Sequence, residues 1–282
     1  MERLDGRVAV VTGAANGIGR ALARLLAAER MQVVLADVQA EPLQLAAKEL
    51  EAGGAEVLPV PTDVTDPAAV RALADAAVER FGAVHVLCNN AGIAGRFGRT
   101  WRATLEEWRW VHDVNVFGIV HCLHAFMPIL LQQEEGHVVN TGSAACFDAL
   151  PGMGVYASSK HAVLGLSEAL ARELAASGAR VGVSVMMPGG VVRSEIMAPE
   201  KTWVGRAGDL PPADDDPVPA AIRAGFTAAV AGGVDPEICA RAGVEGIKAN
   251  RYLVCDDEDL LRAWSAHHVA QGQGEPPRWP PT

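Results

Sequence analysis

Residues 7–19, RVAVVTGAANGIG, are the stretch that decides the fold. The segment opens with a valine-rich, mostly apolar run, as expected of a strand buried on both faces of a parallel sheet. A turn with glycines at Gly13, Gly17 and Gly19 follows, and an alanine- and leucine-rich helical pattern then continues to about residue 30. The stretch therefore predicts a strand, a tight turn and a helix in succession.

The same alternation continues along the chain. Further strands are predicted at residues 32–37, 56–60, 84–88, 137–141, 180–187 and 251–255, and further helices at residues 41–51, 67–80, 104–133, 154–177, 217–230, 235–249 and 258–270. This spacing predicts an α/β fold with a Rossmann-like, doubly wound parallel sheet. We expect about seven strands in the order 3-2-1-4-5-6-7, with helices on both faces.

We expect residues 1–270 to form a single dinucleotide-binding and catalytic domain. Residues 190–220 interrupt the alternation with many prolines, glycines and aspartates. Connections of this length are uncommon in compact domains, so the segment is either a mobile substrate lid or a disordered insertion. The tail, residues 271–282, has neither a helical nor a strand pattern, and it is expected to be loose or to lie on a neighbouring subunit.

Composition excludes several classes of protein. The chain has 282 residues, of which 50% are hydrophobic, so it can bury a large core. Its net charge of -10 gives no electrostatic support for binding nucleic acid or an anionic membrane surface. The five cysteines are scattered without a Cys-x-x-Cys pair, which argues against a disulfide framework and against a zinc site. We expect a small-molecule partner and no metal.

The N-terminal sequence leads directly into the first strand pattern, without the basic, apolar and small-residue order of an export signal. No uninterrupted apolar run approaches the ~20 residues that span a bilayer. We therefore expect a cytoplasmic protein.

The glycine turn is a candidate nucleotide-binding loop. Absent side chains let the backbone approach a pyrophosphate, and the N-terminus of the following helix offers free N–H groups. Asp37 ends the next strand, where a carboxylate accepts hydrogen bonds from the adenosine ribose and repels a 2′-phosphate. Neither Asn16 nor Val38 offers a cation for that phosphate. The pattern predicts NAD, whereas an ordinary tight turn and a solvated strand end are the alternatives.

Tyr156 and Lys160 lie one helical turn apart on the same face of a predicted helix. A free tyrosine ionises near pH ~10, and a neighbouring cation favours the phenolate. We therefore expect Lys160 to lower the pKa of Tyr156 toward a range suited to proton transfer.

Polar and turn-forming residues stand at or just past the ends of the predicted strands, at the edge where open α/β sheets bind ligands. They are Thr12, Asp37, Asp63, Asn89, Ser143 and Pro188.

Several motifs, taken in order, make residues 5–195 resemble the short-chain dehydrogenases/reductases. The motifs are TGAANGIG at residues 12–19, Asp63-Val64, Asn89-Asn90-Ala91-Gly92, Asn115, Ser143, Tyr156-x-x-x-Lys160 and Pro188-Gly189. The glycine spacing differs from that of the extended members of the superfamily, whose loop typically runs Gly-x-x-Gly-x-x-Gly.

The resemblance implies that Asn115, Ser143, Tyr156 and Lys160 are the catalytic residues. Ser143 would hold the substrate oxygen, Tyr156 would move the proton, and Lys160 would also bind the nicotinamide ribose. Asn115 would hold a water that links Lys160 to solvent. The implied cofactor-binding residues are Gly13, Asn16, Gly17, Ile18, Gly19, Asp37, Asp63, Val64, Asn89, Ala91, Gly92, Tyr156, Lys160, Pro188, Gly189 and Val191. Ser143, Ala145, Tyr156 and Gly190 would contact the substrate.

One departure from the family pattern concerns the run after Pro188. Family members usually continue Pro-Gly-x-Val/Ile-x-Thr, and the threonine touches the nicotinamide carboxamide. Here Arg193 occupies the place of the threonine, or Ser194 does after a shift of one residue.

The motifs together predict an NAD-dependent alcohol dehydrogenase/ketone reductase. Most pocket candidates are apolar, which favours a hydrophobic secondary alcohol over a sugar; they are Ala145, Cys146, Leu150, Met153, Gly190 and Ile196, with Trp101 at the rim. An NADP-linked biosynthetic carbonyl reductase and a non-catalytic NAD-sensing regulator are the alternatives. Family members are commonly dimers or tetramers, so the resemblance also implies a homo-oligomer.

Overall fold

Every strand of the central sheet runs parallel to its neighbours. The computed structural model describes residues 1, 3–189, 191–198, 203 and 215–272. Its strands are β1 (Val8–Thr12), β2 (Gln32–Asp37), β3 (Val57–Pro61), β4 (Val86–Asn89), β5 (Gly136–Thr141), β6 (Val181–Met187) and β7 (Leu253–Cys255). They form a seven-stranded sheet in the order β3-β2-β1-β4-β5-β6-β7. The predicted strand order and parallel pairing are confirmed.

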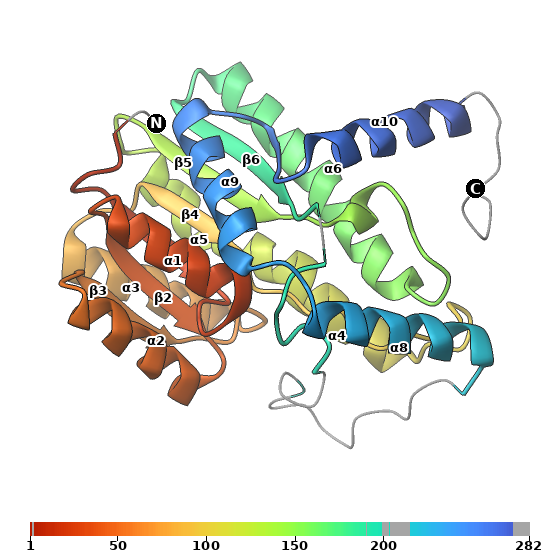
Figure 1. The fold of residues 1–282 in the computed structure, drawn as a ribbon. Coiled ribbons are helices and arrows are strands. Elements are labelled where there is room, and N and C mark those ends of the chain that lie inside the picture. Colours follow the sequence, from red (N-terminus) through yellow and green to blue (C-terminus); the bar gives the residue numbers. More distant parts are fainter. Residues whose placement is uncertain (2, 190, 199–202, 204–214, 273–282) are drawn as a thin grey trace.

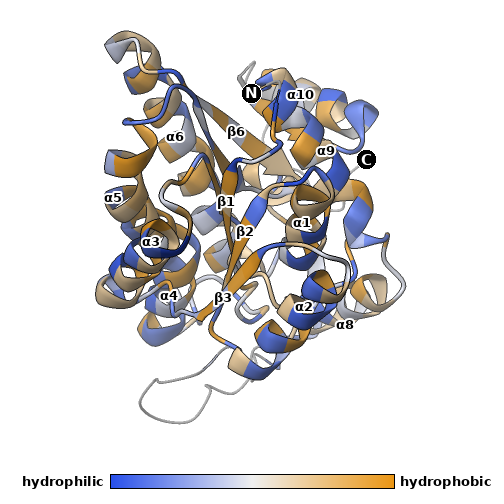
Figure 2. Ribbon diagram, turned by 90° about the vertical axis from the view of Figure 1, so that its left-hand side faces the viewer, coloured by the Kyte–Doolittle hydropathy of each residue, from blue (hydrophilic) through white to orange (hydrophobic). Residues whose placement is uncertain are grey.

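Helices cover both faces of the sheet (Figures 1 and 2). One face carries α1 (Gly17–Ala28), α2 (Ala40–Ala52) and α9 (Pro236–Ala249), and the other carries α3 (Pro67–Phe81), α4 (Leu105–His112), α5 (Gly118–Leu130) and α6 (Gly154–Ser177). Two further helices, α8 (Pro217–Ala231) and α10 (Glu258–Gly272), flank β7 and α9 in the sequence. The arrangement is the doubly wound fold that the alternation predicts.

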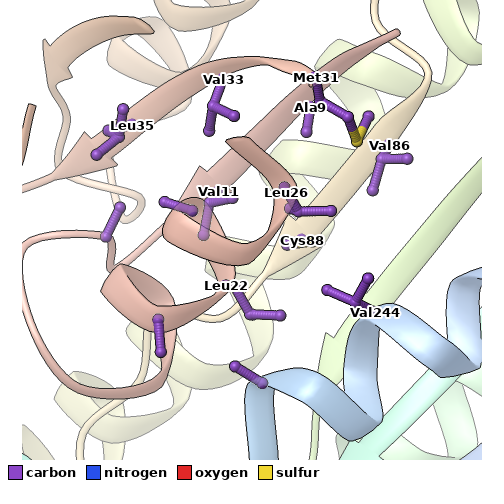
Figure 3. Close-up of a cluster of buried hydrophobic side chains, with 14 of the residues drawn as sticks. Ala9, Val11, Leu22, Leu26, Met31, Val33, Leu35, Val86, Cys88 and Val244 are labelled. Carbon is purple, nitrogen blue, oxygen red and sulfur yellow. The ribbon is translucent and has the colours of Figure 1, made fainter. Parts of the chain in front are cut away.

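Alternation along β1 divides the core between the two faces. Ala9 and Val11 belong to the cluster beneath α1, α2 and α9, whereas Val8 and Val10 belong to the cluster beneath α3, α5 and α6. All five residues of β1 are buried. In Figure 3, Leu22 and other α1 side chains lie over the strands, with Val244 of α9 beside them. Because each fully buried aliphatic side chain contributes roughly 1.5–3 kcal/mol, this packing holds β1 at the centre of the molecule.

The predicted long helix at residues 104–133 is interrupted by a π-helical turn. The helix α4 leads into η1 (Asp113–Phe117), a π-helix, and α5 continues from it. Such wide turns are rare and occur often at functional sites. Asn115 lies within this turn and is 1% exposed.

The stretch Leu105–Leu130 is also long and apolar enough to cross a membrane, by length and composition only. It lies in the middle of the chain, and Trp110 and Phe126 within it are fully buried. The helix α5 packs against α3 and β4, and α4 packs against α6. We therefore interpret this stretch as a helix of the protein core.

The expected lid at residues 190–220 lies largely outside the described residues, as does the tail from residue 273 onward. Of the lid, the structure describes residues 191–198, 203 and 215–220. The last part includes the beginning of α8, where Asp216 caps the helix through the N–H of Val218.

Replacement of Gly19 by alanine should strongly destabilise the loop after β1, because the added Cβ would collide with the carbonyl oxygen of Gly13. We expect Gly19→Ala to lower the free energy of unfolding by about 2 kcal/mol or more. Gly165 is a matched control. Like Gly19 it lies in a helix, α6, but no atom lies within 4 Å of a Cβ added to it. Gly165→Ala should stabilise the protein by roughly 0.5–1 kcal/mol. Equal effects of the two substitutions in denaturant titrations would contradict this account of the loop.

Candidate active site

The loop between β1 and α1 forms a backbone cradle at the carboxyl edge of the sheet. Gly13 and Gly17 have φ angles of +67° and +54°, which favour glycine. A Cβ on Gly13 would lie 2.8 Å from Cα of Ala91, in the loop after β4. Among the described residues, Asn16 makes no side-chain cap at the N-terminus of α1. The N–H groups of the first turn of α1, and the space left by absent side chains, suit an anionic pyrophosphate.

Asp37 lies beside this cradle at the end of β2. Its Oδ2 accepts a hydrogen bond of 3.0 Å from the N–H of Ala15, and its Oδ1 accepts one of 2.9 Å from the N–H of Gln39. Burial of the carboxyl group raises the pKa of Asp37, and these two N–H donors oppose the shift. The side chain is therefore fixed at the end of the strand, where a ribose would meet it.

One cavity of about 440 Å³ connects Asp37 with Tyr156. Most of the predicted site residues line it: Gly13, Asn16, Gly17, Ile18, Asp37, Asp63, Val64, Ala91, Gly92, Ser143, Ala145, Tyr156, Lys160, Pro188, Gly189 and Val191. Gly19, Asn89 and Asn115 are not among the described lining residues, and Gly190 lies outside the described part of the chain.

The side chain of Asn89 joins two neighbouring strands of the sheet and does not belong to the described cavity lining. Its Nδ2 donates to Oδ1 of Asn140 at 2.9 Å, and Asn140 in turn donates to Oγ of Ser167 on α6. The next residue, Asn90, lines the cavity and donates to the carbonyl oxygens of Thr12 and Gly13 at 3.0 and 3.3 Å. Because successive residues of a strand face opposite sides, the sequence already indicated that Asn89 and Asn90 would not face the same way.

Ser143, Tyr156 and Lys160 converge at the other end of the cavity. Ser143 follows β5, whereas Tyr156 and Lys160 lie in the first turns of α6, and all three residues line the cavity. Nζ of Lys160 donates to the carbonyl oxygen of Thr141 at 2.8 Å and lies 5.8 Å from the centre of the Tyr156 ring. The structure thus brings together the hydroxyl, phenol and amine that the sequence predicts to act together.

Burial controls the titration of this pair. It raises the pKa of Tyr156 to about 12, and the side chain of Ser143 opposes the shift. Burial likewise lowers the pKa of Lys160 to about 8. The expectation that Lys160 brings the pKa of Tyr156 below its usual value is therefore wrong for the protein without a ligand, because loss of hydration on burial is the largest cause and raises it.

Asn115 has all of its amide groups bound within the protein. Its Oδ1 accepts from the N–H of Ile93, and its Nδ2 donates to the carbonyl oxygen of Ile93 and to Oγ of Ser159, each at 2.9 Å. The π-helical turn directs this side chain into the loop after β4. A Cβ on Gly92 would lie 3.3 Å from Oδ1 of Asn115 and 3.5 Å from Nζ of Lys160, so the amide lies close to the amine.

The segment after Pro188 separates the two candidates for the missing threonine. Ser194 lines the cavity, and its Cβ would lie 3.1 Å from a Cβ added to Gly17. The guanidinium of Arg193 instead pairs with Asp235 at 2.9 Å, outside the cavity lining. Ser194 is thus the residue of this pair that faces the cofactor cradle.

Apolar side chains surround the Tyr156 end of the cavity. Ala145, Leu150, Met153, Ile196 and Phe226 line it, and Phe226 of α8 packs on Phe97 with ring centres 5.6 Å apart. Two residues predicted for this end of the pocket, Cys146 and Trp101, are absent from the described lining.

Cys146 is a predicted pocket residue that is fully buried and absent from the described lining. Its thiol donates to the carbonyl oxygen of Lys160. Trp101, predicted at the rim, is 78% exposed and outside that lining, whereas Trp110 lines the cavity. Trp110 is also fully buried within a hydrophobic cluster, so it both packs in the core and contributes to the cavity wall.

No group of three or more His, Cys, Asp or Glu side chains that could hold a metal ion occurs among the residues that the structure describes.

Known proteins with similar sequences are dehydrogenases. A family model described as short chain dehydrogenase matches residues 7–205. The chain is 45% identical over 190 residues to 1-deoxy-11-beta-hydroxypentalenate dehydrogenase of Streptomyces avermitilis, covering 67% of this chain and 70% of that one. It is 35% identical over 179 residues to a cyclohexanol dehydrogenase of an Acinetobacter species, covering 64% and 71%.

A solved structure is similar over the full length. The short chain dehydrogenase/reductase from Burkholderia phymatum, in complex with NAD, has a TM-score of 0.92 and 38% identity, with 100% of both chains covered. The similarity therefore includes α8, α9 and β7 as well as the residues matched by the family model.

Because the pKa of Lys160 is lowered, the free energy of unfolding of the unsubstituted protein should differ from that of Lys160→Met by an amount that depends on pH. The unfolded chain binds a proton up to pH 10.5, whereas the folded protein loses it above about 8. The free energy of unfolding of the unsubstituted protein should therefore rise relative to Lys160→Met between these two pH values, by on the order of 3 kcal/mol. Urea titrations of both proteins from pH 7 to pH 11 measure this difference. A difference that does not change with pH would contradict the burial of a charged amine.

Proposed function

The chain belongs to the short-chain dehydrogenase family, and we propose that it transfers a hydride between NAD and a hydrophobic secondary alcohol or the corresponding ketone. The observation that carries this proposal is the convergence of Ser143, Tyr156 and Lys160 at one end of a cavity whose other end is Asp37. An apolar chamber around the phenol suits an alcohol with little polar surface.

In the proposed oxidation, Oγ of Ser143 holds the substrate hydroxyl beside the phenol oxygen of Tyr156. The phenolate accepts the hydroxyl proton while the carbon atom loses a hydride, so that a ketone forms. Bound NAD⁺ supplies the hydride acceptor and a positive charge. The Lys160 cation stabilises the phenolate, and reduction of a ketone uses the same groups in the reverse direction.

The residues proposed to hold the dinucleotide follow the cavity. The glycine cradle and the N-terminus of α1 would bind the pyrophosphate, and Asp37 would accept hydrogen bonds from the adenosine ribose. Val191 lines the cavity, and we assign it to the carboxamide end, whereas Ser194 faces Gly17 of the cradle.

Asn115 has a different proposed role from the predicted water ligand. Because its side-chain amide is occupied by Ile93 and Ser159, we assign it as a positioning residue for the Gly92 backbone and Lys160. Asn89 likewise supports the sheet, and its neighbour Asn90 supports the cradle.

The apolar cavity and the name of one relative, a cyclohexanol dehydrogenase, support a cyclic alcohol. Lys160 is the single cation among the described lining residues. The lining also includes Asp148, whose side chain is exposed and which is close in sequence to the apolar Leu150. A neutral alcohol therefore fits this charge distribution better than a carboxylate-bearing one. The NADP-linked reductase and the non-catalytic regulator remain the alternatives.

A homo-oligomer and a cytoplasmic location are also proposals. Leu105 and Phe117, on the α4–η1 stretch, are 66% and 52% exposed. Large apolar side chains at the surface of a helix favour burial against another subunit.

Substitution of the phenol by Tyr156→Phe should lower kcat/KM for alcohol oxidation by at least about 10³-fold, because the proton acceptor is removed while the ring remains. The assay follows NADH absorbance with a panel of cyclic secondary alcohols. Tyr252→Phe is the matched control, since this other tyrosine donates to the carbonyl oxygen of Leu164 outside the cavity lining. Full activity of Tyr156→Phe would contradict the mechanism, and tight NADH binding without turnover of any alcohol would favour the regulator.

Two substrates that are similar in shape but differ in charge test the proposal that the substrate is a neutral alcohol. We expect the methyl ester of hydroxycyclohexanecarboxylic acid to be oxidised with a kcat/KM at least about tenfold higher than that of the free acid, because the acid adds a negative charge near Asp148. Asp148→Asn should narrow this difference. Preference for the free acid would contradict the proposal.

A further inference from the structure

The segment after Pro188 crosses the glycine cradle and carries a second acidic side chain to it. Ser194 lies opposite Gly17, as described above, and Nδ2 of Asn16 donates to Oε2 of Glu195 at 3.4 Å. Glu195 also lines the cavity that contains Asp37. A carboxylate from a distant part of the chain therefore stands beside the loop proposed to hold the cofactor.

Asp37 and Glu195 act on each other electrostatically. The charge of Glu195 adds to burial in raising the pKa of Asp37. Asp37 is already bound by two backbone N–H groups, which disperse part of its negative charge. Two carboxylates at the same end of the cavity produce a stronger negative potential there than Asp37 alone.

We propose that Glu195 is a second specificity-determining residue, which together with Asp37 excludes the 2′-phosphate of NADP from the adenosine end of the cavity. This inference rests on the proposed function, because it presumes that the adenosine ribose lies beside Asp37. A 2′-phosphate adds roughly two negative charges and would approach both carboxylates. An unphosphorylated ribose adds no charge, so the repulsion weakens the binding of NADP and does not act on the adenosine ribose of NAD.

The contact with Asn16 makes the position of Glu195 specific. Asn16 precedes α1 and lies next to Ala15, whose N–H binds Asp37. Two neighbouring loop residues therefore contact the two acidic side chains, Ala15 that of Asp37 and Asn16 that of Glu195. A lysine or arginine at either position would reverse the preference.

Fluorescence titration of NADH and NADPH measures the proposal directly, without turnover. We compare the unsubstituted protein with Glu195→Gln and with Glu173→Gln, a matched control on the exposed surface of α6. The Kd for NADPH divided by the Kd for NADH should fall about tenfold in Glu195→Gln, because one charge near the 2′-phosphate is removed. Glu173→Gln should leave the ratio unchanged, and Glu195→Lys should lower it further.

Different outcomes separate this inference from the proposed function. An unchanged ratio in Glu195→Gln and Glu195→Lys would overturn the role of Glu195 while leaving NAD binding intact. Equal tightening of both cofactors would also overturn it, since that result indicates general repulsion of the pyrophosphate. If the unsubstituted protein binds neither cofactor, or binds NADPH more tightly, the proposed function itself fails. Thermal unfolding of each variant verifies that the fold is retained.

Discussion

Parallel pairing of the strands is the constraint on which the site depends. Because all seven strands point the same way, the residues that follow β1, β2, β4 and β5 meet at a single edge of the sheet. Buried valines on both sides of β1 hold that register, since a shift by one residue would exchange the two core faces. The glycine cradle, Asp37 and Ser143 are brought to one edge by this packing, and the hydrogen bond from Ala15 to Asp37 fixes the first two to each other.

Burial then gives the polar residues their chemistry. Tyr156 and Lys160 stand in a part of the cavity where neither is well hydrated, so burial raises the pKa of the phenol to about 12 and lowers that of the amine to about 8. The phenol therefore does not ionise readily until further positive charge enters the cavity. In the proposed mechanism, this property makes proton transfer from the alcohol depend on the positive charge of the bound oxidised cofactor.

Hydrophobic alternation and glycine spacing are local signals, and they predicted the strands and helices of the doubly wound sheet. The resemblance to a known family supplied most of the predicted site residues, and most of those line the cavity. The sequence did not predict the π-helical turn at Asn115, which depends on hydrogen bonds to Ile93 and Ser159. The choice between Arg193 and Ser194 also required the path of the segment over Gly17. The pKa of Tyr156 was misjudged for the same reason, since desolvation depends on residues distant in the chain.

The most direct measurement of the central claim is the ionisation of Tyr156 with and without NAD⁺. The chain has two tyrosines, so tyrosine labelled with a heavy carbon isotope at Cζ yields two resonances, which Tyr252→Phe assigns. The account predicts that Tyr156 has a pKa of about 12 in the free protein, falling below its ordinary value of 10.0 when NAD⁺ is bound. A pKa that stays near 12 with NAD⁺ bound would contradict the proposed proton acceptor.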